Sequence, residues 1–199
     1  MKQIPKLEKK VHENNGLIRT SDMLGLGMKA YEIRKLAMDG VIERVRQGYY
    51  QMGNSSAQSD EELIAKLFPD GVICMNTALF FYGYSNRTPM AWDIAIDKNT
   101  SKSRFKLDYP FVQPYYLEPH LLTFGITIGD FSGHSMQIFD RDRLICECLK
   151  YEGKMDRETY NKAIQGYVAD AKKNITRLLE YAEQRRVLKK VKDRIRVWL

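Results

Sequence analysis

The stretch from Glu32 to Met52, EIRKLAMDGVIERVRQGYYQM, constrains the fold more than any other part of the chain. Its first seven residues have the spacing of an amphipathic helix, and Asp39-Gly40 is a stop signal. An alternating run follows, turns at Gln47-Gly48 and returns, which predicts a tight two-stranded hairpin. A short helix followed directly by such a hairpin is typical of a small unit of mixed helix and sheet.

Two further short helices are expected before this stretch. A first amphipathic helix stops at Asn14-Asn15-Gly16. Thr20 or Ser21 is placed to cap a brief second helix, and a third helix spans residues 28–38. Three short helices and a hairpin in about fifty residues are the pattern of a winged helix-turn-helix, which we predict over residues 1–53.

The third helix is amphipathic when its residues are placed on a wheel at about 100° per residue. One side is apolar and consists of Leu26, Ala30, Ile33, Leu36 and Ala37. The opposite side carries Tyr31, Arg34, Lys35 and Met38. Arginine chelates guanine edges, lysine neutralises phosphate, and tyrosine reaches phosphate or a thymine methyl group. The sequence therefore predicts that this face contacts duplex DNA.

In the hairpin, strand alternation puts Arg44 and Arg46 on one face and Val45 on the other. A basic wing beside a recognition helix lies along the adjacent phosphates or enters the minor groove. Either element alone is explained as well by a solvated helix or a surface hairpin, but their order, their spacing and the net charge of +4 over residues 1–52 favour DNA binding. The candidate DNA contacts are Lys29, Tyr31, Arg34, Lys35, Arg44, Arg46 and Tyr49.

A second domain is expected over residues 57–199. NSSAQSD, residues 54–60, is polar and lacks any large apolar residue, so it is the best linker candidate. A helix is expected over 61–68, and a strand leading into a buried helix over 72–84. Further strands are expected over MAWDIAID (90–97), FKLDYPFV (105–112), LLTFGITI (121–128) and HSMQIFD (134–140). From Asp156 onward the pattern is helical, with Asn174 placed to cap one helix. The predicted fold is α+β: an N-terminal winged helix-turn-helix and a mixed α/β domain that ends in helices.

Charge is unevenly distributed along the chain. Residues 1–52 carry ten Lys and Arg against six Asp and Glu, residues 53–155 ten against thirteen, and residues 156–199 twelve against six. Basic ends indicate polyanionic or acidic partners. The basic stretch over residues 185–199 is a solvated helix face, a second DNA contact, or a surface for an acidic protein. For that protein surface the candidate residues are Arg185, Lys189 and Lys192, with Trp198 as either an anchor or the last core residue.

The sequence offers little for catalysis. Asp93 and Asp97 are four residues apart on an expected strand and so stand about 13 Å apart, whereas two-metal phosphoryl transfer needs carboxylates that converge on ions about 4 Å apart. DFSGHS, residues 130–135, fits a turn between strands. The sequence contains neither a P-loop nor a serine elbow. We therefore expect no enzymatic activity and no cofactor.

The cysteines and histidines of the sequence do not indicate a disulfide framework or a metal site. Cys74, Cys146 and Cys148 fit neither a disulfide framework nor a four-ligand zinc site, and they are expected to be buried in a reducing cytosol. The histidines lack metal-ligand spacing, so no metal site is expected. The first residues show no signal-peptide pattern, and the longest uncharged run, residues 71–86, is shorter than the ~20 residues of a membrane span. These features predict a cytoplasmic protein without a membrane partner.

Residues 16–52, GLIRTSDMLGLGMKAYEIRKLAMDGVIERVRQGYYQM, resemble the N-terminal winged helix of the AbiEi antitoxins, regulators from bacterial abortive-infection (type IV) toxin–antitoxin systems. One shared feature is an I-R-T-like entry to the second helix. Another is a helix-to-wing signature formed by Leu36, Gly40, Ile42, Arg44, Val45, Arg46, Gly48 and Tyr50. CMNTALFFYGYSNRTP, residues 74–89, resembles the start of the family's C-terminal domain. The resemblance covers nearly the whole chain, more weakly after Pro114.

The resemblance implies a transcriptional repressor that binds the operator DNA of its own operon through the winged helix. It also implies an antitoxin whose C-terminal domain counteracts a toxin of the nucleotidyltransferase class encoded beside it. Carried over by position, the resemblance implies that Tyr31, Arg34 and Lys35 are recognition-helix contacts and that Arg44 and Arg46 are wing contacts. It also implies that Thr20 contacts a phosphate. Two alternatives stay open: a winged-helix transcription factor with a ligand-sensing C-terminal domain, and an enzyme that carries a winged-helix appendage.

Overall fold

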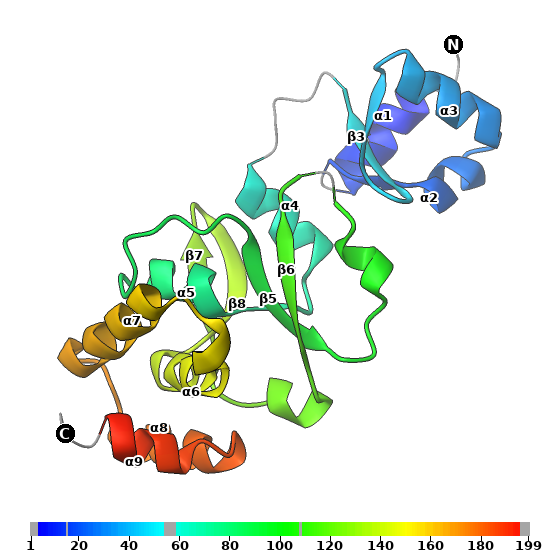
Figure 1. Cartoon of the computed structure of the whole chain (residues 1–199). Coiled ribbons are helices and arrows are strands. Elements are labelled where there is room, and N and C mark those ends of the chain that lie inside the picture. The colour runs from blue at the N-terminus through cyan, green and yellow to red at the C-terminus, as the bar shows by residue number, and fades with distance from the viewer. Residues whose placement is uncertain (1–3, 15, 54–58, 108, 196–199) are drawn as a thin grey trace. The chain divides into compact units, whose positions relative to one another are not determined.

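The computed structural model describes residues 4–14, 16–53, 59–107 and 109–195. The chain forms two compact units, each built from helices and strands, so the protein is of the α+β class (Figure 1). The first unit comprises Met1–Asp60 together with Ser101–Pro110, and the second comprises Glu61–Thr100 together with Phe111–Leu199. The segment Ser101–Pro110 was expected in the second domain, but it packs with the first. Most of the expected linker, residues 54–58, lies outside the described residues.

In the first unit, short helices pack around a small antiparallel sheet of strand order β1-β3-β2. Its elements are α1 (Ile4–Glu13), β1 (Ile18–Arg19), α2 (Thr20–Gly25), α3 (Ala30–Met38), β2 (Ile42–Arg46), β3 (Tyr49–Met52) and the 3₁₀ helix η1 (Lys102–Phe105). One apolar cluster holds the helices and strands of residues 4–52 together, formed by Leu7, Val11, Ile18, Met23, Met28, Ile33, Ile42 and Met52. Burial of these side chains, rather than intrinsic propensity, stabilises helices as short as these.

Acidic side chains in the first turns of α2 and α3 satisfy backbone N–H groups at the helix starts. The N–H of Arg19 donates to Asp22 Oδ2 at 3.1 Å, and the N–H of Lys29 donates to Glu32 Oε2 at 2.6 Å. The expectation that Thr20 or Ser21 caps the second helix is therefore corrected, because α2 begins at Thr20 and Arg19 holds the cap position.

The second unit contains a five-stranded mixed sheet of order β6-β5-β4-β8-β7. Its strands are β4 (Val72–Ile73), β5 (Trp92–Asp97), β6 (Val112–Leu117), β7 (Ile126–Phe131) and β8 (His134–Phe139). The pairs β5–β6 and β4–β8 are parallel, whereas β4–β5 and β7–β8 are antiparallel. Its helical elements are α4 (Asp60–Leu67), α5 (Met75–Phe81), η2 (Pro119–Leu122), α6 (Arg141–Tyr151), η3 (Glu152–Lys154), α7 (Arg157–Ala169), α8 (Ile175–Gln184) and α9 (Leu188–Arg194).

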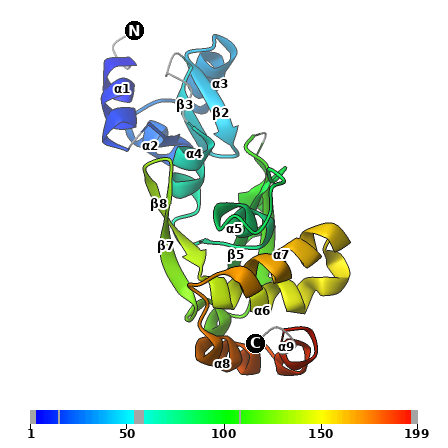
Figure 2. The same ribbon diagram turned by 90° about the vertical axis from the view of Figure 1, so that its left-hand side faces the viewer.

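Helices cover both faces of this sheet. The Asp93 carboxylate on β5 accepts a hydrogen bond from the N–H of Asn76 on α5, at 2.8 Å. The next residue, Ile94, lines a small cavity with Ile64 and Phe68, from α4 and the residue that follows it. Because successive strand side chains point to opposite faces, α4 and α5 lie on opposite sides of the sheet. Helix α6 lies between the sheet and the pair α8 and α9 (Figures 1 and 2).

The expected strand over residues 105–112 is wrong. Its first residue ends η1, and the paired strand begins only after Pro110, at Val112. Strand β6 then continues through Pro114, which is tolerated because β6 lies at the edge of the sheet and needs no second hydrogen-bonding neighbour there. The strand expected over residues 121–128 begins only at Ile126. The strands expected at 90–97 and 134–140 are confirmed by β5 and β8, and the side chain of Asn174 caps α8 as expected.

Helix α6 is an element that the sequence did not predict. Residues 142–149 within it are all buried, including the charged Asp142, Arg143 and Glu147. These charges obscure the apolar spacing of a core helix, because buried ionised groups are rare and occur only when they are paired. In this helix they are paired. The Asp142 carboxylate accepts hydrogen bonds from Tyr167 Oη at 2.8 Å and from Arg177 Nε at 2.7 Å.

Glu147 lies at the centre of a buried ion network. It accepts hydrogen bonds from Arg143 Nε at 2.7 Å and from Arg185 Nε and Nη2 at 2.6 and 2.7 Å. All three side chains are at most 5 % exposed. The Arg143 guanidinium also lies over the rings of Phe124 and Phe139, 4.0 and 4.7 Å from their centroids. Glu147 therefore ties α6 to the end of α8.

We predict that Glu147→Gln strongly destabilises the second unit, because it leaves two buried guanidiniums without their counter-charge. The expected loss in free energy of unfolding is roughly 3–5 kcal/mol. The control is Glu118→Gln, which removes an exposed ion pair with Lys98 and should change stability little. Urea unfolding of the full chain followed by circular dichroism measures both. Equal stability of the two variants would contradict a structural role for the Glu147 network.

Candidate functional site

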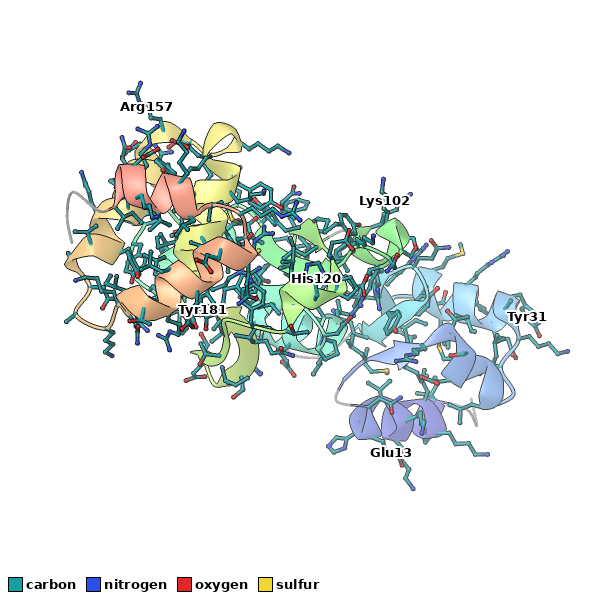
Figure 3. The ribbon with its side chains drawn as sticks, turned by 90° about the horizontal axis from the view of Figure 1, so that it is seen from below. Glu13, Tyr31, Lys102, His120, Arg157 and Tyr181 are labelled. Carbon is teal, nitrogen blue, oxygen red and sulfur yellow. The ribbon has the colours of Figure 1, made fainter. Side chains whose placement is uncertain are left out.

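The outer face of α3 carries the side chains expected to contact DNA. Tyr31 is 62 % exposed, and Arg34 and Lys35 are also exposed, whereas Ile33 is buried in the core of the first unit. Tyr31 projects from the ribbon of this unit (Figure 3). Lys29 is exposed just before the helix. The helix therefore presents a polar, cationic face of neighbouring side chains to solvent.

A β-bulge separates the two arginines of β2. Arg44 pairs with Tyr50 and Arg46 pairs with Tyr49, so Val45 is the extra residue in the ladder. The bulge breaks the expected alternation, and Val45 is buried at 6 % exposure. Arg44 is exposed, but Arg46 is half-buried. The expectation that Arg44 and Arg46 lie on one face and Val45 on the other is corrected for this reason.

Arg46 packs against Tyr49 instead of extending into solvent. Its guanidinium carbon lies 3.9 Å from the centroid of the Tyr49 ring, and that of Arg19 lies 5.4 Å from the same ring. Arg46 Nη1 also donates to the carbonyl oxygen of Arg104 at 3.2 Å. Burial lowers the pKa of Arg46, the neighbouring Tyr49 opposes this shift, and the charges of Arg104 and Arg19 add to it. Tyr49 is thus the centre of a group of guanidiniums.

Thr20 lies beside the turn of the hairpin. Its N–H donates to the carbonyl oxygen of Gly48 at 2.9 Å, which joins the start of α2 to the turn. Gly48 has φ +81°, a left-handed conformation that favours glycine. The structure thus places Thr20, Arg46 and Tyr49 around one turn, and Lys29, Tyr31, Arg34 and Lys35 on or just before α3. Arg19 and the segment around Arg104 were missed, because the place of Arg19 beside Tyr49 and of Arg104 beside Arg46 depends on tertiary packing.

The three candidate partner contacts near the C-terminus do not share a surface. Lys189 and Lys192 are exposed on α9. Arg185 is 5 % exposed and engaged by Glu147, so this expected surface residue is buried. The expectation was wrong because a basic residue is taken to be exposed when its acidic partner is distant in sequence. The partner of Arg185 is Glu147 on α6. Trp198 lies outside the described residues.

Asp93 and Asp97, the two carboxylates considered above as a possible catalytic pair, each have local hydrogen-bond partners. Asp93 is 3 % exposed and accepts the Asn76 N–H, while its own N–H donates to Thr77 Oγ1 at 2.9 Å. Asp97 Oδ1 accepts the N–H of Asn99 at 2.8 Å in the turn after β5. Burial raises the pKa of Asp93 to about 6, although these hydrogen bonds oppose the shift. Asp93 lines a cleft of about 430 Å³ whose wall also includes Ser85, Arg87, Gln113, Tyr115 and Thr159.

The cysteines are buried free thiols, as expected, and burial raises the pKa of each of them: Cys74, Cys146 and Cys148. In the part of the chain that the structure describes, no cluster of three or more His, Cys, Asp or Glu side chains is arranged to hold a metal ion. Among the described residues, no helix combines the length and apolar character needed to cross a bilayer. No protein-family model matches the chain, and no curated protein matches it with significant similarity.

We predict that Asp93→Asn stabilises the protein at neutral pH but not at pH 4. The pKa of Asp93 rises on folding from 3.8 to about 6, so the folded state holds the proton more tightly and stability falls as pH rises through this range. The loss reaches roughly 3 kcal/mol above pH 6. Asparagine keeps an oxygen for the Asn76 N–H and avoids the buried charge. Urea unfolding between pH 4 and 8 measures the effect, with Asp97→Asn on the same strand as control. A gain that does not depend on pH would contradict this account.

Proposed function

We propose that the first unit is a winged helix-turn-helix that binds duplex DNA, and that the protein is a transcriptional repressor of its own operon and an antitoxin. The observation that carries the DNA-binding proposal is the exposed face of Tyr31, Arg34 and Lys35 on α3, directly ahead of a hairpin with an exposed arginine, Arg44. In a winged helix these elements correspond to the recognition helix and the wing.

The packing of α3 supports this assignment. Ile33 anchors the helix in the core, and α3 contacts both α2 and β2. A helix held in this way presents its outer side chains on a rigid support, which base readout in the major groove requires. Arg34 suits a guanine edge, whereas Lys35 and Arg44 suit phosphates.

The residues of the helix-to-wing signature have clear structural roles that fit a wing. Gly40 and Gly48 have φ of +69° and +81°, which favours glycine at the helix end and at the hairpin turn. Ile42 and Val45 are buried, and Ile42 fixes the hairpin on the apolar cluster. The signature thus describes how the hairpin is built. This supports the resemblance to the AbiEi winged helix.

The antitoxin part of the proposal rests on the resemblance of residues 16–52 and 74–89 to the AbiEi antitoxins. The partner would be a nucleotidyltransferase-type toxin encoded beside the gene. The exposed cations Lys189 and Lys192 on α9 are the candidate contact surface for an acidic patch on that partner. Arg185 is left out of this surface because it is buried.

A ligand-sensing repressor is the second candidate, and the cleft beside Asp93 favours it. The cleft has a volume of about 430 Å³, within the range of small-molecule sites. Its wall combines a buried carboxylate with hydroxyl, amide and guanidinium groups. A small polar molecule bound there would act as the effector, and operator binding would then depend on its concentration.

We predict that Arg34 and Arg44 contribute to DNA binding in different ways. On a duplex that contains the region upstream of the gene, Arg34→Ala should cost about 1–3 kcal/mol and relax preference at one position. Arg44→Ala should weaken binding to all sequences alike and lower the slope of log K against log salt by about 1. Gel-shift titrations of the full chain at several salt concentrations separate the two effects.

Lys9→Ala is the matched control for this experiment, because Lys9 is an exposed cation of the same unit on a different helix, α1. It should change neither the affinity for the upstream duplex nor the salt slope. Unchanged binding by an Arg34/Lys35/Arg44 triple alanine variant would refute the assignment of α3 and the hairpin.

We predict that charge reversal on α9 impairs toxin neutralisation but not DNA binding. Cells that express the adjacent nucleotidyltransferase should be rescued by the full chain and less well by Lys189→Glu/Lys192→Glu. The control Lys150→Glu/Lys172→Glu changes the same number of exposed charges elsewhere in the second unit and should rescue fully. Rescue that fails in Arg34→Ala instead would mean that neutralisation works through repression.

A further inference from the structure

The connection between β5 and β6 crosses into the first unit and packs beside its hairpin. Residues Ser101–Pro110 group with the first unit, although β5 and β6 belong to the second. Three contacts hold the segment in place. Arg46 Nη1 donates to the carbonyl oxygen of Arg104, Leu107 forms an antiparallel β-bridge with Arg46, and Tyr109 Oη donates to Asp60 Oδ2 at 2.6 Å. Through the β-bridge the segment pairs with the end of β2, at the residue that follows the bulge.

This segment brings positive charge to the hairpin. Its sequence SKSRFK, residues 101–106, has a basic side chain at every second position and no acidic one. Lys102 and Lys106 are exposed, and Arg104 is half-buried. Lys102 projects outward from the ribbon (Figure 3). The hairpin and the strand beside it already contribute Arg46 and Arg19, whose guanidiniums lie over the Tyr49 ring. The surroundings of Tyr49 and Arg46 therefore gather cations from three stretches that are distant in sequence.

The basic groups around Tyr49 suit an anionic partner. The guanidiniums of Arg19 and Arg46 lie over the Tyr49 ring, and Arg46 Nη1 donates to the carbonyl oxygen of Arg104. Phosphates along a duplex would neutralise such a group of positive charges. The contacts named above that hold the segment are made by Arg104, Leu107 and Tyr109. Lys102 and Lys106 take no part in them and are exposed to solvent.

We propose that residues 101–106 form a second phosphate-binding element of the DNA-binding surface, next to the hairpin, with Lys102 and Lys106 as its contacts. This inference rests on the proposed binding of duplex DNA by the first unit. Arg104 and Arg46 position the element through their hydrogen bond. The lysines contact the sugar–phosphate backbone and add affinity without sequence preference.

The test is a Lys102→Gln/Lys106→Gln variant of the full chain. Its affinity for the upstream duplex and for an unrelated duplex of equal length should fall by the same factor. Each phosphate contact on duplex DNA contributes about 0.9 to the slope of log K against log salt. The loss of two lysine contacts should therefore reduce the magnitude of the slope by about 2. Both side chains are exposed, so the thermal unfolding midpoint should match that of the wild type. The control Lys150→Gln/Lys172→Gln removes two exposed cations of the second unit and should leave the slope unchanged.

Each outcome decides the inference. If the wild type binds duplex DNA, Arg34→Ala weakens it and the double glutamine variant keeps the wild-type slope, residues 101–106 are a structural contact only and the inference is overturned. If the control double variant lowers the slope equally, the effect is one of net charge and the inference also fails. If the folded wild type binds neither duplex, the proposed function fails, and the inference falls with it.

Discussion

The carboxylate of Glu147 is 2 % exposed and accepts hydrogen bonds from two buried arginines, Arg143 on α6 and Arg185 at the end of α8. Removing a counter-charge from such a network exposes the full desolvation cost of the groups left behind. Because this cost opposes separation of Glu147 from Arg185, the network holds α6 between the sheet and the end of α8. The contacts of Asp142 with Tyr167 and Arg177 repeat the arrangement one turn earlier. The C-terminal helices are fixed by these directional ion pairs as well as by apolar packing.

The first unit uses a different device, since it is small and its apolar cluster has few members. Its hairpin is anchored by Ile42, and its turn is tied to α2 through the bond between Thr20 and Gly48. The guanidiniums around Tyr49 add cation–π contacts on the solvent side. These guanidiniums thus contribute to the stability of the hairpin. Under the proposed function the same side chains lie close to DNA, which would link binding to stability.

Features governed by local periodicity could be predicted from the sequence. The exposed face of α3, the strands β5 and β8 and the cap at Asn174 all follow from the spacing of nearby residues. Features that depend on a distant partner could not be predicted. The bulge at Val45 is set by pairing across the hairpin, and the burial of Arg185 depends on Glu147. Helix α6 was missed because the buried Asp142, Arg143 and Glu147 interrupt the apolar spacing by which a core helix is recognised.

The crossing of residues 101–110 into the first unit has a consequence for how this protein can change over generations. A domain encoded by one continuous stretch of a gene is exchanged by a single recombination event at its border. Here the border near residue 60 leaves behind ten residues that belong to the first unit. A chimera joined at that point would lack Arg104 and Leu107, which contact Arg46, and would carry an unrelated connection between β5 and β6 in their place. The two units are therefore expected to be inherited together, and new combinations to arise by substitution within them.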